Sequence, residues 1–247
     1  EEPSVVALDT EKGKVKALGE EAKKHGITMS VHAPYFISLS SVEREKRIKS
    51  VEYIRQSAYA SKLLDANIMV VHCGSCAKIS RETAMEYAAE TLTDAAQMLE
   101  DNGFKTLLGI ETMGKVNQLG TLDEVIDICS IDKRLYPVVD FGHLNARECG
   151  GVFPTPDDYK RVFDEINKTL GASYAENLHC HFSKIEYSSA GEKKHLTFDD
   201  AVYGPRFEPL AEAIIKDGLA PRIICESDDT MAEDALAMKQ YWLERRG

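Results

Sequence analysis

Short apolar runs rich in β-branched residues alternate with longer amphipathic stretches along the chain. The apolar runs are interpreted as buried strands, because parallel strands covered on both faces are apolar almost throughout. The six predicted strands are Ile27–His32, Ile68–His72, Leu107–Glu111, Val138–Asp140, Leu178–Phe182 and Ile223–Glu226. Strand–helix alternation of this kind predicts a mainly parallel sheet covered by helices.

The stretches between the strands have a helical period. Between residues 84 and 99, apolar side chains recur at spacings of three and four on one face, and acids occupy the other. Three helix starts carry capping sequences, which are Ser40 with Glu43, Thr121 with Glu124, and Thr155 before Pro156. No linker or change of composition marks a boundary, so residues 1–247 are predicted to form a single domain.

Each predicted strand ends in a side chain that can bind a metal. These residues are His32, His72, Glu111, Asp140, one of His179 and His181, and Glu226. They are separated by about 29 to 47 residues, the length of one strand–helix unit or slightly more. In a parallel barrel the carboxyl ends of all strands open onto one face, where active sites lie. The pattern therefore predicts that six ligands converge there, with His143 and His195 in the segments that follow two of the strands.

A single histidine after a strand is more often a hydrogen-bonded loop residue, and a single acid there is usually a helix cap. Six matching strand ends are harder to explain in this way. Imidazole and carboxylate ligands without a thiolate suit zinc, manganese or iron(II). The residues therefore predict a metal cluster of more than one ion.

The cysteines and the charge limit the classes of function. The six cysteines are scattered and predict reduced thiols in a cytoplasmic protein, although Cys73 and Cys76 form a lone C-x-x-C that can be redox-active or bind metal. The net charge of −11 disfavours a broad basic surface for nucleic acid, so a polyanion substrate would need a local positive source such as bound metal. No apolar run approaches the length of a membrane span, and the N-terminus is not an intact signal peptide.

Segments at the strand ends resemble the motifs of endonuclease IV, the metal-dependent apurinic/apyrimidinic endonucleases. Residues 30–39 (SVHAPYFISL) resemble the family's H-x-x-[YF]-x-I-N-L, and residues 71–75 (VHCGS) resemble H-P-G-S. Residues 110–114 (IETMG), 139–143 (VDFGH) and 224–227 (ICES) resemble E-N-T-A-G, D-T-C-H and L-E-T. All occur in the family's order, from about residue 16 to the C-terminus.

The resemblance implies a TIM (β/α)8 barrel with up to three zinc ions, manganese and iron being alternatives. The first metal would be held by His32, His72 and Glu111. Glu111 would bridge to a second metal, held with Asp140, Glu226 and the histidine of the 178–182 strand. The third would be held by His143 and His195. Glu226 and Glu111 would also be catalytic, because they would position the attacking water and the metals.

Three departures from the family pattern affect these assignments. Counting from the strand start favours His179 as the ligand, whereas counting on to Gly191 favours His181. The family's D-x-H pair reads Lys193-Lys194-His195, and a lysine ammonium has no lone pair to donate; Glu192, one residue earlier, is a candidate replacement. In addition, Cys73 stands at the usual proline and Cys76 stands where a second histidine is common.

The implied reaction is hydrolysis of the phosphodiester 5′ to an abasic site during DNA base excision repair, by a monomer that needs no nucleotide cofactor. Tyr35 and Phe36 match the family positions that enter DNA at the damaged step; the alternative is that they are core aromatics. A second hypothesis is a divalent-metal sugar isomerase or epimerase. The acidic charge suits it, but the many histidines favour the nuclease. A non-catalytic metal-binding scaffold is a third alternative, disfavoured by the complete ligand set.

The number of strands does not fill a barrel. A barrel of this class has eight strands in about 250 residues, and the resemblance places two strands and a helix before the first ligand. We therefore expect that this chain lacks the first strand, first helix and second strand, with residues 5–8 at most a strand fragment. Three divalent ions would change the net charge from −11 to −5 and concentrate positive charge at the barrel mouth.

Overall fold

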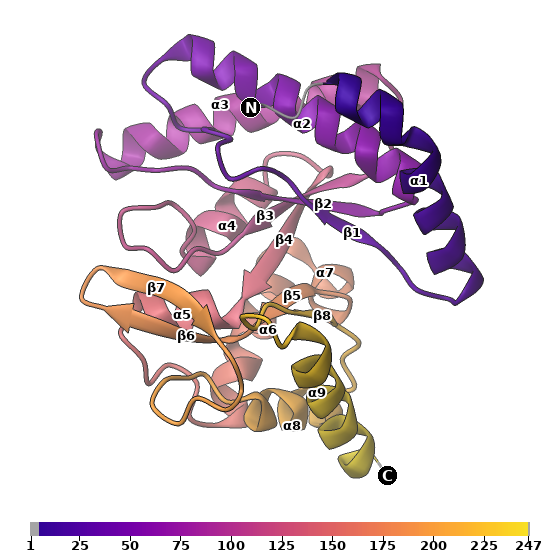
Figure 1. The fold of residues 1–247 in the computed structure, drawn as a ribbon. Coiled ribbons are helices and arrows are strands. Elements are labelled where there is room, and N and C mark those ends of the chain that lie inside the picture. Colours follow the sequence, from indigo (N-terminus) through magenta and orange to yellow (C-terminus); the bar gives the residue numbers. More distant parts are fainter. Residues whose placement is uncertain (1–4, 247) are drawn as a thin grey trace. The chain divides into compact units, whose positions relative to one another are not determined.

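The computed structural model describes residues 5–246. Its main sheet has six strands in the order β1-β2-β3-β4-β5-β8 (Figure 1). These strands are β1 (Ser30–His32), β2 (Ile68–His72), β3 (Leu107–Glu111), β4 (Leu135–Asp140), β5 (His179–Phe182) and β8 (Arg222–Cys225). All six predicted strands are present, with ends that differ from the prediction by at most three residues.

Helices alternate with these strands. They are α1 (Val5–Lys24), α2 (Arg44–Leu64), α3 (Arg81–Asp101), α4 (Leu122–Cys129), α5 (Phe141–Arg147), α6 (Pro156–Leu170), α7 (Ala172–Glu176), α8 (Phe207–Asp217) and α9 (Met231–Arg245). None of those described combines the length and apolar character needed to cross a bilayer. Residues 5–8 lie in α1, so the expectation of a strand fragment there is wrong.

The chain divides into two compact units, each described by itself. The first comprises Glu1–Ile110 and Ile131–Tyr136, and the second comprises Glu111–Ser130 and Pro137–Gly247. The boundary passes through β3 and β4. The prediction of a single domain stays a prediction.

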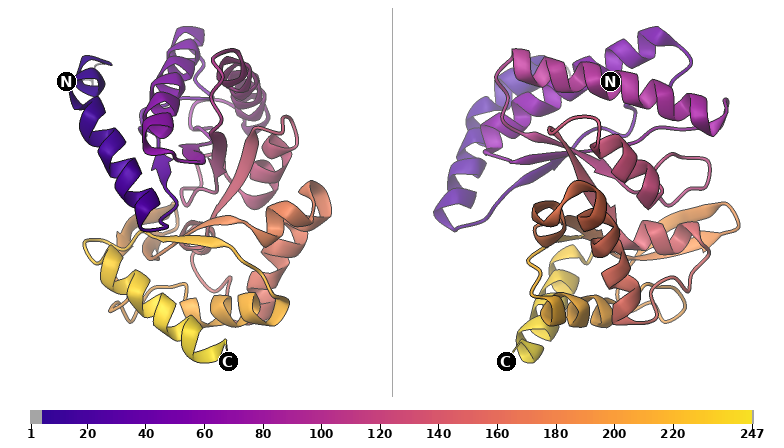
Figure 2. Two further views of the ribbon diagram at one scale, coloured as in Figure 1. Left: turned by 90° about the vertical axis from the view of Figure 1, so that its right-hand side faces the viewer. Right: turned by 180° about the vertical axis from the view of Figure 1, so that it is seen from behind.

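In the first unit, β1 and β2 pair in parallel, with Ser30 opposite Ile68. Helices α2 and α3 lie side by side (Figure 2). The apolar face of α3 is buried as its period predicts, including Ala88 and Leu92. This packing fixes the two strands whose ends carry His32 and His72.

In the second unit, β4, β5 and β8 pair in parallel. Asp140 is opposite His181, which is itself opposite Ile224. Cys180 and Phe182 of β5 belong to the aromatic-rich core formed with α6 and α8. Because strand residues alternate between faces, His181 points to the other face of the sheet. The register therefore places Asp140 and His181 side by side at the strand ends.

A two-stranded antiparallel hairpin forms the segment after β5 that contains His195. It consists of β6 (Lys184–Ser188) and β7 (Gly191–Leu196). Glu186 is opposite Lys194, but Tyr187 is opposite Glu192, so Lys193 is an extra residue that forms a β-bulge. The bulge shifts the alternation by one residue, and Glu192 can therefore face the same side as His195.

Two of the three predicted helix starts are confirmed. Thr121 and Glu124 form the capping box of α4, and Pro156 is the first residue of α6. The prediction for Ser40 is wrong, because α2 begins at Arg44 and its N-cap position is Glu43, three residues later than predicted. The Ser40 hydroxyl instead donates to the carbonyl oxygen of Ser75 and accepts from its amide, both at 2.8 Å.

Candidate metal centre

Four side chains at the strand ends form a first cluster, which we call the strand-end group. Glu111 ends β3, Asp140 ends β4, His181 lies in β5 and Glu226 follows β8. Each offers one ligand atom, and these atoms lie within 4.8 Å of one another. His181 Nδ1 is 2.7 Å from Glu111 Oε1 and 3.1 Å from Glu226 Oε1. Three of the four are buried, and Glu226 is 26 % exposed.

The close packing of these carboxylates perturbs their protonation. Burial raises the pKa of Asp140, and the charges of Glu226 and Glu111 raise it further against the opposing effect of His143. Burial lowers the pKa of His181, but Glu111 and Glu226 outweigh this and hold it well above its usual range. Burial also raises the pKa of Glu226, but the hydrogen bond from His181 leaves it lowered overall. Without metal, protonated His181 therefore supplies the cation between two carboxylates.

A second cluster, the hairpin group, consists of His143, Glu192 and His195. Their ligand atoms also lie within 4.8 Å of one another. His143 Nε2 is 3.4 Å from Glu192 Oε2, and the rings of His143 and His195 meet edge to face with centroids 5.4 Å apart. Burial lowers the pKa of His143, but the nearby carboxylates, Asp140 first, raise it to about 9.

The ring nitrogens of the histidines are oriented by neighbouring groups. His143 Nδ1 donates to the carbonyl oxygen of Thr112 at 2.9 Å, and Ser183 Oγ is 2.8 Å from His195 Nδ1. Asp140 adds to this order, because its Oδ1 accepts from the amide of His143 at 2.7 Å and caps α5. Both histidines therefore direct Nε2 toward the site. Metal-binding histidines commonly show this arrangement, in which a hydrogen-bond partner holds the other ring nitrogen.

Two glycines let Glu192 enter the hairpin group. The Glu192 amide donates to the Gly114 carbonyl oxygen at 3.1 Å. A Cβ at Gly114 would lie 2.6 Å from Glu192 Cβ, and one at Gly191, where φ is +89°, would lie 2.1 Å from the Gly114 oxygen. The hairpin thus approaches the loop after β3 more closely than other residues allow.

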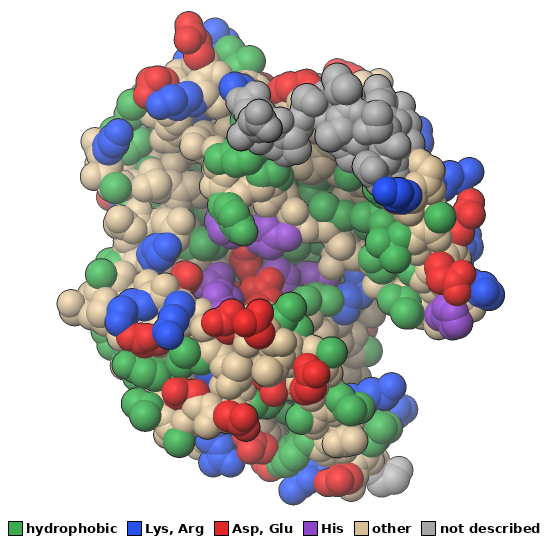
Figure 3. Space-filling model, in the orientation of Figure 1, with side chains coloured by type: hydrophobic (Ala, Val, Ile, Leu, Met, Phe, Trp, Pro, Cys, Tyr) green, Lys and Arg blue, Asp and Glu red, His purple; other side chains and the backbone are tan. Residues whose placement is uncertain are grey.

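The donor set fits a divalent cation. In the described part of the chain, Asp140 Oδ2 and Glu192 Oε2 are buried and accept no hydrogen bond. A buried carboxylate oxygen without a donor is costly unless a cation satisfies it. On the second unit, histidine and acidic side chains lie next to one another (Figure 3). Imidazole and carboxylate donors of this kind suit zinc, manganese or iron(II).

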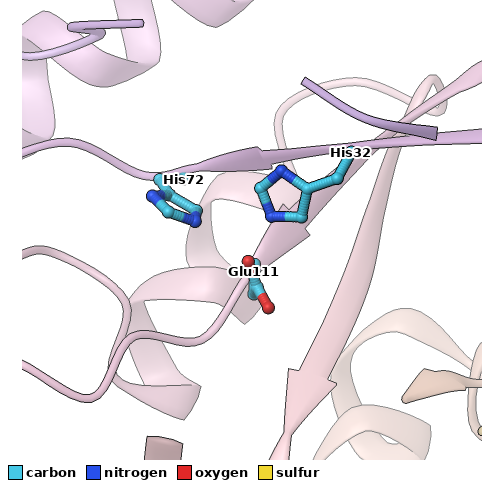
Figure 4. Close-up of side chains that lie close together, drawn as sticks. All are labelled: His32, His72 and Glu111. Atoms are coloured by element: carbon cyan, nitrogen blue, oxygen red, sulfur yellow. The ribbon is translucent and has the colours of Figure 1, made fainter. Parts of the chain in front are cut away.

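The remaining predicted ligands lie at the ends of β1 and β2. The rings of His32 and His72 meet edge to face with centroids 5.0 Å apart, and His32 Nδ1 donates to the Ala33 carbonyl oxygen. Figure 4 shows the side chains of His32 and His72 at the ends of these two strands.

His179 lies outside both the strand-end group and the hairpin group. It is 1 % exposed, and neither ring nitrogen has a hydrogen-bond partner within residues 5–246. Burial, assisted by His181 and Arg222, lowers its pKa to about 3. It shares a strand face with His181 but lies two residues further from the carboxyl end of β5. Of the two alternatives, the structure brings His181 to the strand-end group.

The aromatic and cysteine candidates lie on the first unit, where the ring centroid of Tyr35 is 6.4 Å from that of His32 and 6.3 Å from that of His72. Tyr35 is 83 % and Phe36 50 % exposed, so they are not core aromatics. Cys73 and Cys76 form no disulfide within the described residues and belong to none of the described metal groups. Lys193 is the bulge residue and pairs with Glu186. From the sequence, Glu192 is a candidate only as a replacement for the acid of the family's D-x-H pair. The bulge that directs its side chain toward His195 leaves no signal in residue spacing.

Comparisons with known proteins show the same fold. The chain matches the family described as xylose isomerase-like TIM barrel over residues 2–245. It is 28% identical over 228 residues to an uncharacterized protein of Methanocaldococcus jannaschii, covering 92% of this chain and 80% of that one. It is 34% identical over 167 residues to a probable endonuclease 4 of Carboxydothermus hydrogenoformans, covering 66% of this chain and only 57% of that one.

Two solved structures are similar at low identity. A D-tagatose 3-epimerase-like protein gives a TM-score of 0.71 at 21% identity, over 94% of this chain and 83% of that one. Endonuclease IV from Thermus thermophilus gives 0.65 at 18%, over 95% and 82%. These likenesses show the fold alone. With the family match, they confirm the predicted fold class, a TIM barrel represented here by six strands.

Proposed function

Because the chain belongs to the xylose isomerase-like TIM barrel family and gathers more ligands than one ion can use, we propose that it is a metal-dependent endonuclease. Its substrate would be DNA with an abasic site, and the bond hydrolysed would be the phosphodiester 5′ to that site, as in base excision repair. The proposal includes zinc as the metal, manganese or iron being alternatives, and a monomer in the cytoplasm.

One observation carries this proposal. The strand-end group and the hairpin group together supply seven metal-competent side chains within the second unit. A zinc ion takes about four ligands, so this number supports at least two ions. Phosphodiester hydrolysis uses several ions because both the attacking and the departing oxygen need stabilisation. Divalent ions held there would supply a more acidic water and positive charge for the phosphoryl oxygens.

The side chains of the chain itself would hold and orient the reactants. Glu226 has a lowered pKa and is the most exposed member of the strand-end group, so it is ionised and accessible to accept a proton from water. Glu111 is buried and would position the attacking water and the metals. The Nε2 atoms of His143 and His195 would hold a divalent ion, which would supply positive charge for the departing 3′-oxygen.

Exposed aromatic side chains support DNA as the substrate. Tyr35 is 83 % exposed, and Phe36 packs edge to face on Tyr53 with ring centroids 4.8 Å apart. An abasic nucleotide has no base to unstack, so extruding it is comparatively cheap. The two rings would occupy the gap that remains in the base stack.

Incision of a duplex with a single abasic site tests the proposal. The metal-replete protein should cut the lesion strand once and leave a 3′-hydroxyl, whereas the matched intact duplex should remain uncut. No incision at any zinc or manganese concentration would overturn the proposal. An end-labelled strand distinguishes cutting 5′ to the site from spontaneous cleavage 3′ to it.

A sugar epimerase remains the second candidate, because the strand-end group by itself is a complete single-ion site. Its three carboxylates beside one imidazole could move a proton on a small ketose. Incubation with common ketoses and aldoses separates the candidates. Conversion of a sugar without DNA incision would favour the epimerase, and it would leave the hairpin group without a role in catalysis.

A further inference from the structure

The loop that joins β3 to α4 is organised around the guanidinium of Arg147. Its Nη1 donates to the carbonyl oxygens of Met113 at 3.0 Å and Lys115 at 2.9 Å. Its Nη2 donates to those of Val116 at 3.2 Å and Gln118 at 3.1 Å. Arg147 is only 9% exposed. A buried cation requires such partners, so the loop conformation and the position of Arg147 depend on each other.

The same loop holds the amino-terminal end of β7. Gly114 accepts the amide hydrogen bond of Glu192, and Lys115 forms a β-bridge with Gly191. The Val116 amide donates to the carbonyl oxygen of Ala190 at 3.2 Å. Three consecutive loop residues therefore fix three consecutive hairpin residues, and the last of these is the acidic member of the hairpin group.

Arg147 also shares a helix with a ligand. His143 and Arg147 are four residues apart on α5 and thus lie on one face. One helix turn therefore carries both an imidazole of the hairpin group and the cation that shapes the loop beneath Glu192.

We propose that Arg147 is a positioning residue that sets Glu192 beside His143 and His195. The divalent ion of the hairpin group is retained only when Arg147 holds the 113–118 loop. This inference rests on the metal-binding part of the proposed function. It goes beyond that part, because it assigns the occupancy of one site to a residue that touches no ion.

Arg147→Met tests this assignment, and Arg47→Met is the matched control. Arg47 is 8% exposed in α2, where it donates to the Ser41 carbonyl oxygen and pairs with Glu90, and it belongs to the first unit. Zinc per chain is counted by native mass spectrometry after loading and removal of excess metal. Arg147→Met should hold one ion fewer than the wild type, as should Glu192→Gln, while Arg47→Met should hold the wild-type number.

Amide hydrogen exchange of the metal-free protein gives a readout that no ion influences. Exchange of the 114–118 and 190–192 amides should be at least about tenfold faster in Arg147→Met and unchanged in Glu192→Gln. Should Arg147→Met not fold, Arg147→Lys keeps the charge but loses the planar fork, and it should show the same changes in part.

The outcomes separate this inference from the proposed function. Equal ion counts and equal exchange in Arg147→Met and the wild type would overturn the inference, whatever the incision assay shows. Wild-type protein that holds its full complement of ions but does not incise abasic DNA would overturn the nuclease, while the loss of one ion in Arg147→Met would still support the role of Arg147.

Discussion

The strand-end group and the hairpin group present similar ligands on very different supports. Asp140 and His181 stand on paired parallel strands whose backbones are fixed by the sheet. Glu192 and His195 lie on a two-stranded ribbon with a bulge. The close contact of Gly191 and Glu192 with Gly114, in the loop after β3, holds this ribbon in place. The first group therefore inherits its geometry from the fold, whereas the second depends on local contacts that single substitutions can remove.

The largest effect should come from the strand-end group. Glu226→Gln keeps the shape of the side chain but removes the carboxylate that accepts a proton, so incision should fall by about 10³-fold. The rate is measured on the abasic duplex at saturating zinc, with circular dichroism to confirm folding. The control is Glu244→Gln on α9, where the carboxylate is exposed. Wild-type activity in Glu226→Gln would remove its assigned role.

A substitution at a close backbone contact should weaken zinc binding by the hairpin group alone. Gly114→Ala places a methyl group 2.6 Å from Glu192 Cβ. The hairpin must then move, and zinc affinity of the hairpin group should fall by about 100-fold, with the strand-end group unaffected. Competition with a chromogenic chelator measures each affinity.

Gly13→Ala is the control for this substitution, because nothing lies within 4 Å of its Cβ position. It should leave both affinities unchanged. Equal weakening of both groups by Gly114→Ala would show that they are not supported independently.

Removal of the hydrogen-bond partner of His195 should weaken zinc binding less. Ser183→Ala removes the hydroxyl that lies 2.8 Å from His195 Nδ1, so the ring loses its fixed orientation. Zinc affinity of the hairpin group should fall by about tenfold. Ser50→Ala is a matched control, since that hydroxyl is also buried but donates to the Lys46 carbonyl oxygen in α2. An unchanged affinity in Ser183→Ala would show that packing alone orients the ring.

The number of protons released on metal binding compares the two groups one residue at a time, because each group contains one histidine with a raised pKa. His143 has a pKa of about 9 and His181 one well above its usual value, so both are protonated near pH 7 without metal. Metal binding must displace about two protons, one from each group. Affinity should therefore increase as the pH rises toward 9.

Calorimetry of zinc binding in buffers of different ionisation enthalpy counts these protons. His143→Ala and His181→Ala should each remove about one. His179→Asn should remove none, because burial lowers the pKa of His179 to about 3 and the ring is already neutral. Proton release that is unchanged in both alanine variants would contradict the assignment.

The strand ends were predictable because a parallel sheet imposes a simple rule. Apolar runs of three to six residues mark the strands, and the side chains at their carboxyl ends must share one edge. This rule placed Glu111, Asp140 and Glu226 correctly at the strand ends. It left His179 and His181 open, because both lie on the same face of one strand and only the distance from the strand end separates them.

The hairpin was not predictable by the same means. Residues 184–196 contain few apolar positions, and the bulge at Lys193 breaks the alternation that identifies a strand. Arg147 was missed as well, because its partners are backbone carbonyls, which carry no sequence signature. The start of α2 was misplaced for a related reason: Ser40 has the chemistry of a cap but makes its hydrogen bonds with Ser75.

The bulge at Lys193 shows how a small evolutionary change in a surface ribbon would alter the hairpin group. Insertion of one residue between Glu186 and Tyr187, opposite Lys193, would restore regular alternation and turn Glu192 away from His195. The strand-end group would keep all its ligands, because it lies on other strands. A single-residue insertion in a surface ribbon would thus take the hairpin group apart without altering the core, which offers a short mutational route between two sets of candidate ligands on one scaffold.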